Sequence, residues 1–135
     1  MFVDASALCA VLLDEPERAA FEGKLALARE AITSPVAVWE TLRAMIREIG
    51  ADPDTARGRL MAYLDVPEIR LVEIGAAEAQ LALDAMVHFG KGRHQAALNM
   101  GDCFAYACAR ANEVPLLFKG NDFSKTDIEQ ANPSG

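Results

Sequence analysis

Four short apolar runs alternate along the chain with longer segments of helical periodicity. The apolar runs lie at about residues 1–4, 31–33, 69–72 and 115–118. Each run is too short for a helix, and helix-start signals such as Ser34–Pro35 and Asp52–Pro53 open segments between them. Strands that alternate with helices predict a parallel sheet covered by helices on both faces. We therefore expect a three-layer α/β/α fold around a central, mostly parallel sheet of four to five short strands.

Apolar residues spaced three and four apart predict the inward faces of the helices. In the helix after Ser34–Pro35 they are Trp39, Leu42, Ile46 and Ile49. In the segment 76–89 they are Ala79, Leu83 and Met86, and after Asn99 they are Phe104, Ala107, Cys108 and Ala111. The end of the chain, 129–135, is expected to fray. With no repeat and no linker, residues 1–135 are expected to form a single domain.

One carboxylate, Asp102, lies in the first turn of an otherwise apolar helix. Asn99 stands where an N-cap residue would stand, and Gly101 keeps side-chain bulk away from the helix start. An acid beside a buried stripe costs free energy unless its charge is needed there. Asp102 is therefore either a capping residue that favours the helix dipole or part of a functional site.

Three further acids lie at the edges of predicted elements. Asp4 ends the first apolar run, Glu40 lies in the second turn of the helix after Ser34–Pro35, and Asp122 follows the last apolar run. Each has a structural alternative: Asp4 as an N-cap, Glu40 as the partner of a surface arginine, and Asp122 as a turn residue. The carboxyl ends of parallel strands share one edge of the sheet, so the acids could converge there.

Clustered carboxylates raise one another's pKa values unless a cation neutralises them. Oxygen ligands suit magnesium or manganese, whereas zinc prefers His or Cys. Beside the acids, Ser6 could orient the Asp4 carboxylate, and Asn121 could offer another oxygen. Candidates for contacts with phosphate are the basic residues near the predicted site, Arg43, Lys91, Arg93 and Lys119.

Composition narrows the classes of function. The 135-residue chain has a formal net charge of −7, which argues against a broad electrostatic grip on nucleic acid but not against a nuclease built on acids and metal. No apolar run approaches a membrane span, no signal segment opens the chain, and the three cysteines form no CxxC pair. We expect a cytoplasmic protein without a disulfide framework.

Five segments together carry a family resemblance. They are Phe2–Leu8, Glu40, Gly90–His94, Leu98–Ala107 and Leu116–Phe123. In order and spacing they resemble VapC-type toxins of the PIN-domain ribonuclease superfamily, and the likeness covers essentially the whole chain. The segment around Asn99–Met100–Gly101–Asp102 is its most specific part.

The resemblance implies a magnesium-dependent endoribonuclease, the toxin of a type II toxin–antitoxin system. Its partners would be RNA, a VapB-type antitoxin whose tail occupies the acidic site, and a second copy in a homodimer. Asp4 and Asp102 match the principal metal ligands of the family, Glu40 the third acid and Asp122 the fourth. Asn121 stands where relatives can carry another Asp, which lowers the local negative charge.

The expected reaction is hydrolysis of an RNA phosphodiester by water that metal on Asp4, Glu40 and Asp102 activates. Asp122 would share or tune a weaker second metal, and Ser6 would hold a ligand through a hydrogen bond. The alternative is a catalytically weak PIN-like module whose acidic cleft mainly binds a basic partner peptide. Metal-dependent RNA cleavage separates these two functions.

Overall fold

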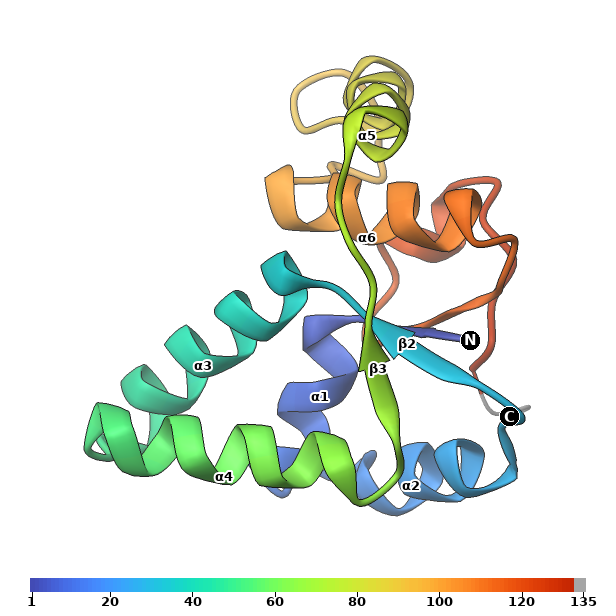
Figure 1. Ribbon diagram of the computed structural model, residues 1–135. Helices are drawn as coiled ribbons and strands as arrows, with labels where there is room; N and C mark the ends of the chain where they lie inside the picture. The colour runs from blue at the N-terminus through green and yellow to red at the C-terminus, as the bar shows by residue number, and fades with distance from the viewer. Residues whose placement is uncertain (133–135) are drawn as a thin grey trace.

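Four short strands form one parallel sheet in the computed structural model, which describes residues 1–132 (Figure 1). The strands are β1 (Phe2–Val3), β2 (Ala31–Thr33), β3 (Ile69–Leu71) and β4 (Leu116–Leu117). Their order is β3-β2-β1-β4, and every pairing between neighbours is parallel. The predicted mostly parallel sheet is confirmed, with four strands.

Helices connect the strands and cover both faces of the sheet. They are α1 (Ala5–Leu12), α2 (Arg18–Leu27), α3 (Pro35–Ile49), α4 (Pro53–Asp65), α5 (Ala76–Phe89) and α6 (Met100–Ala111), with a short 3-10 helix η1 (Phe123–Lys125) near the end. The start signals act as predicted, because the Ser34 and Asp52 side chains accept hydrogen bonds from the backbones of Ala37 and Thr55. Within residues 1–132, no helix is both long and apolar enough to cross a membrane.

Alternate strand residues point into two separate cores, which gives three layers. Phe2 and Leu116 pack with α5 and α6 on one face, whereas Val3 and Leu117 pack with α1, α2 and α4 on the other. Figure 1 shows α5 and α6 above the sheet, α1, α2 and α4 below it, and α3 on its left-hand side. The predicted three-layer α/β/α fold is therefore confirmed.

The inward face of α3 differs from the predicted stripe. Its buried residues are Ala37, Thr41 and Met45, while Trp39 is 60% exposed and Ile49 is 45% exposed. The helix packs against α1 and α6 through this column, in which Ala37 and Thr41 are small enough to allow a close approach. Leu42 and Ile46 are partly buried against the core, so the prediction was wrong for Trp39 and Ile49.

Small residues also determine how α5 and α6 pack together. In α5, Ala82 and Ala85 are buried, while the predicted core residues Leu83 and Met86 are half exposed. Two helices with alanine at their interface can approach closely, which excludes the longer side chains. In α6, Ala107 and Cys108 are buried as predicted, Phe104 is partly buried and Ala111 is exposed.

The segment after η1 is tied to the sheet rather than frayed. Ala131 is buried, and Gln130 forms a parallel bridge with Leu116 of β4. The side chain of Asn132 accepts a hydrogen bond from the backbone N–H of Phe118 (3.0 Å) and donates one to its carbonyl (2.8 Å). The expectation of fraying was wrong for residues 129–132. The other residues for which fraying was expected, 133–135, lie outside the described part of the chain.

Candidate active site

Asp4 lies at the carboxyl end of β1 and caps α1. Its Oδ2 accepts hydrogen bonds from the backbone N–H of Ser6 (3.0 Å) and from the Ser6 hydroxyl (2.5 Å). The residue is 4% exposed, and this burial raises the pKa of the Asp4 carboxyl above its ordinary value although the hydrogen bonds lower it. The capping role is thus present, and the same side chain is a buried acid at the edge of the sheet.

Ser6 joins Asp4 to the loop after β4. While its hydroxyl donates to Asp4, its oxygen accepts a hydrogen bond from the backbone N–H of Lys119 (3.0 Å). The Lys119 ammonium lies 2.9 Å from a carboxylate oxygen of Glu15 and 3.4 Å from one of Glu17. Ser6 therefore orients the Asp4 carboxylate, as we expected, and is itself held by the backbone of Lys119 from the other end of the chain.

Asp102 occupies the third position of α6 and completes a capping box. Its Oδ2 accepts from the backbone N–H of Asn99 (3.1 Å), and its own N–H donates to the Asn99 side chain (2.9 Å). Burial raises the pKa of the Asp102 carboxyl to about 6, and the charges of Asp4 and Asp122 add to the rise. Asp102 therefore combines the capping role with electrostatic coupling to two other acids.

Glu40 projects from α3 toward the start of α6. A Cβ atom at Gly101 would overlap the Glu40 carboxylate, so this glycine leaves the space that the acid occupies. Burial raises the pKa of the Glu40 carboxyl to about 7, and the charges of Asp4 and Asp102 contribute to the rise. In the described residues, Glu40 forms no ion pair with Arg43 or Arg47, which excludes the alternative of a surface pair.

Asp122 and Asn121 follow β4 and are exposed. Gly120 (φ +100°) allows the turn that leads from Lys119 to them. Asp122 precedes η1, but its side chain makes no capping hydrogen bond. The charge of Asp122 contributes to the raised pKa of Asp102, which couples it to the other three acids. Because Asp122 is exposed, it is the outermost of the four.

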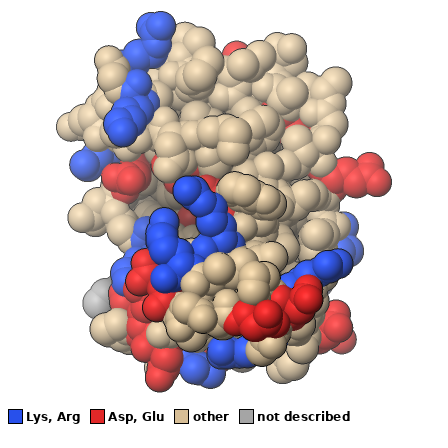
Figure 2. Space-filling view, turned by 90° about the vertical axis from the view of Figure 1, so that its left-hand side faces the viewer, with Lys and Arg blue, Asp and Glu red and all other residues tan. Residues whose placement is uncertain are grey.

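The four acids come from four separate elements at the edge of the sheet where the strands end. The left-hand side of Figure 1, where α6 begins, faces the viewer in Figure 2, and acidic and basic side chains are interspersed there. The donors fit a hard divalent cation, because all are carboxylates and their charges raise one another's pKa values. Among residues 1–132, however, no three His, Cys, Asp or Glu side chains stand close enough to hold a metal ion, so binding one would draw the carboxylates together.

The basic candidates divide into free and paired side chains. Arg43, Lys91 and Arg93 are exposed, and none of them forms an ion pair within residues 1–132. Lys119 is instead paired with two glutamates, so a phosphate would have to compete with them. Sequence reasoning missed Glu15 and Glu17, since a pairing across more than 100 residues leaves no local pattern.

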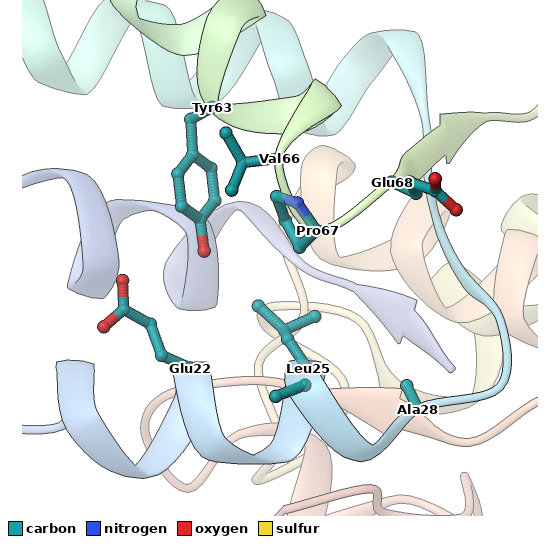
Figure 3. A pocket seen from close by; sticks show the side chains of 8 residues that line it. Glu22, Leu25, Ala28, Tyr63, Val66, Pro67 and Glu68 are labelled. Carbon is teal, nitrogen blue, oxygen red and sulfur yellow. The ribbon is translucent and has the colours of Figure 1, made fainter.

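Two apolar hollows lie outside the four acids. One, of about 450 Å³, lies between α2 and α4, where Tyr63 and Val66 point toward Glu22 and Leu25 (Figure 3). The other, of about 420 Å³, lies between α5 and α6 and is lined by residues that include Leu83, Met86 and Met100. Neither includes one of the four acids, although Lys91 and Asn99 also line the hollow between α5 and α6.

The raised pKa values predict how the metal-free protein responds to pH. Folded Glu40 and Asp102 bind protons more tightly than the unfolded chain does, mainly between about pH 4 and pH 7. The free energy of unfolding should therefore fall as pH rises through this window. After allowance for the solvent around these half-buried groups, we expect a loss of about 1 kcal/mol, or about 3–5 °C in Tm, between pH 5 and pH 8.

Thermal denaturation in the presence of a chelator, followed by circular dichroism, measures this slope. Glu40→Gln should flatten the slope because it removes the group with the larger shift. Glu48→Gln, an exposed acid on the same helix, is the matched control and should keep it. Equal slopes in both variants and the unmodified protein would contradict the assignment.

The family profile and the similar proteins all indicate the same family. The profile of the PIN domain matches residues 1–129. VapC ribonuclease Mb0640 of Mycobacterium bovis is 38% identical over 128 residues, which are 95% of each chain. Ribonuclease VapC of Mycolicibacterium smegmatis is also 38% identical, over 95% of this chain and 97% of that one.

Solved structures extend the likeness to the fold. The crystal structure of VapC20 from Mycobacterium tuberculosis, described as a toxin that cleaves the sarcin–ricin loop, gives a TM-score of 0.77 at 19% identity and covers 98% of both chains. A toxin–antitoxin complex from Klebsiella pneumoniae gives 0.70 at 13% identity, over 93% of this chain and 92% of that chain. At these identities the likeness concerns the fold alone.

Proposed function

The chain belongs to the PIN domain family, and from this premise we propose that it is a VapC-type toxin, a magnesium-dependent endoribonuclease. The observation that carries the proposal is the set of four coupled acids, Asp4, Glu40, Asp102 and Asp122, on four separate elements at one edge of the sheet. Relatives at 38% identity over nearly the whole chain are named ribonucleases, which supports the reaction class.

In this proposal Asp4, Glu40 and Asp102 hold magnesium, or manganese, with Asp122 at the margin. The bound ion would supply a Lewis acid that neutralises phosphate charge and makes water a better nucleophile. Ser6 keeps Asp4 turned toward the site, and Lys119 holds Ser6 through its backbone N–H. Arg43, Lys91 and Arg93 bind the RNA backbone, since they are exposed and unpaired among the described residues.

The partners in this proposal are RNA, a VapB-type antitoxin and a second copy of the chain. A basic antitoxin tail would relieve the repulsion between the carboxylates, as a cation does. The likeness in fold to a chain of a toxin–antitoxin complex supports an antitoxin. The half-exposed apolar side chains of Leu83 and Met86 on α5 support a homodimer that buries them.

Cleavage of a mixed cellular RNA pool by the purified chain tests the proposal. We expect discrete fragments with magnesium and none with excess chelator, because the acids repel phosphate until a cation neutralises them. Gel electrophoresis and sequencing of the fragment ends give the substrate. If folded protein with magnesium cuts no RNA but binds a basic peptide, the chain is instead the catalytically weak module.

A further inference from the structure

Trp39 is the only tryptophan of the chain, and it lies on the surface directly before Glu40. It is 60% exposed although its spacing predicts burial, so residues 1–132 leave most of its surface uncovered. A large exposed aromatic side chain costs free energy and often marks a binding surface. The question is which class of partner this surface fits.

Arg43 lies against Trp39 on the surface of α3. Its guanidinium carbon lies 5.8 Å from the centroid of the Trp39 ring, a cation–π contact between residues one helical turn apart. Arg43 is also three residues, one helical turn, from Glu40, whose carboxylate is turned toward Gly101 at the start of α6. Figure 2 shows Lys and Arg side chains beside acidic ones near the middle of this face.

The chemistry of this surface differs from that of the two apolar hollows. The hollow between α5 and α6 is lined largely by aliphatic and methionine side chains, and the one between α2 and α4 combines apolar residues with Glu22 and Glu68 but has no arginine or lysine among the described residues that line it. Around Trp39 the nearest turn instead carries Arg43, and the next carries Arg47 on the Glu40 side of the helix. An aromatic face for a base and a cation for a phosphate are the two elements that proteins use to bind single-stranded nucleic acid.

We propose that Trp39 and Arg43 bind one nucleotide of single-stranded RNA, with its base stacked on the indole and its phosphate on the guanidinium. This inference rests on the proposed function and specifies its substrate as unpaired RNA. A base inside a duplex has no free face for the indole, so the surface selects loops and single strands. Binding here presents a neighbouring phosphodiester to the carboxylates around Glu40.

Trp39 fluorescence tests the contact directly, because no other tryptophan contributes to the signal. The protein used is Asp102→Asn, which the proposed function makes inactive, so the RNA stays intact during the titration. A short single-stranded RNA of mixed sequence should quench the fluorescence to saturation, and the same sequence in a duplex should not. Quenching by both forms alike, or by neither, overturns the proposal.

Variants separate stacking from general binding. Trp39→Ala should weaken RNA binding about tenfold, as the loss of one stacked base does, and Trp39→Phe should restore most of it. In the cleaving protein, Trp39→Ala should raise KM about tenfold with kcat little changed. Leu27→Ala, an exposed apolar residue on α2, is the matched control and should leave both values unchanged.

Arg43→Ala provides an independent measurement. Losing one phosphate contact should reduce the slope of log affinity against log salt by about 0.7, the value for single strands. An unchanged slope contradicts the role of Arg43.

Other outcomes have distinct meanings. A fluorescence change that depends on protein concentration without RNA means that a second copy covers Trp39, which overturns the proposal. If the unmodified protein cleaves RNA but Trp39→Ala binds and cleaves equally well, this inference is wrong and the proposed function stands. If the unmodified protein neither cleaves nor binds RNA, the proposed function itself is wrong.

Discussion

Asp102→Asn should abolish RNA cleavage while the protein stays folded. The substitution removes a charge that Asp4 and Asp122 already disfavour, and with it a ligand for the cation. Removing a group that merely orients a metal ligand costs 10- to 100-fold, so loss of a ligand should cost more than about 100-fold. Asparagine keeps a side-chain oxygen that can accept from the Asn99 backbone, so the capping box survives in part. Gel assays with magnesium and circular dichroism spectra measure the two effects.

The metal-free stability of this variant should change in the opposite direction to its activity. Because burial raises the pKa of Asp102, its charged form destabilises the fold, and Asp102→Asn should raise Tm in chelator by a few degrees, about 2–5 °C. Asp52→Asn is the matched control, since Asp52 caps α4 on the exposed surface. It should leave cleavage unchanged. Full activity in the Asp102 variant would exclude this acid from the site.

Local signals predicted most of the fold. Pro after Ser or Asp gave the first residues of α3 and α4, because a cap depends on a few consecutive residues. Apolar runs between helices gave all four strands, because each strand is also a run of a few consecutive residues. The inward faces were predicted less well, since Trp39 and Leu83 are exposed while Ala37 and Ala82 are buried. Periodicity identifies apolar residues but not how closely two helices approach.

The candidate site followed from where the acids lie in the sequence. Asp4 and Asp122 follow strands and Asp102 begins a helix, so parallel topology alone brings them to one edge of the sheet. What the sequence could not show is how side chains distant in the chain restrain one another. The pairing of Lys119 with Glu15 and the fit of Glu40 against Gly101 both depend on the folded packing.

Gly101→Ala should reduce activity strongly without reducing stability. The added Cβ would overlap the Glu40 carboxylate, and since that group is the end of a flexible side chain, it can rotate away at little cost. Replacing a glycine within a helix by alanine favours folding by about 0.5–1 kcal/mol. Displacing a reacting or ligating group by about 1 Å can cost about 100-fold in rate. We therefore expect Tm to stay level or rise while cleavage falls about 100-fold, measured by melting curves and initial rates.

A double-mutant cycle with Glu40→Ala determines whether the loss acts through Glu40. If alanine at 101 has already expelled the Glu40 carboxylate, Glu40→Ala should cost little more in that background, so the two effects are far from additive. Gly58→Ala in α4 is the control, because nothing lies within 4 Å of its added Cβ, and it should stabilise the protein without changing cleavage. Additive losses would mean that Gly101 acts on Asp102 or on the start of α6 instead of on Glu40.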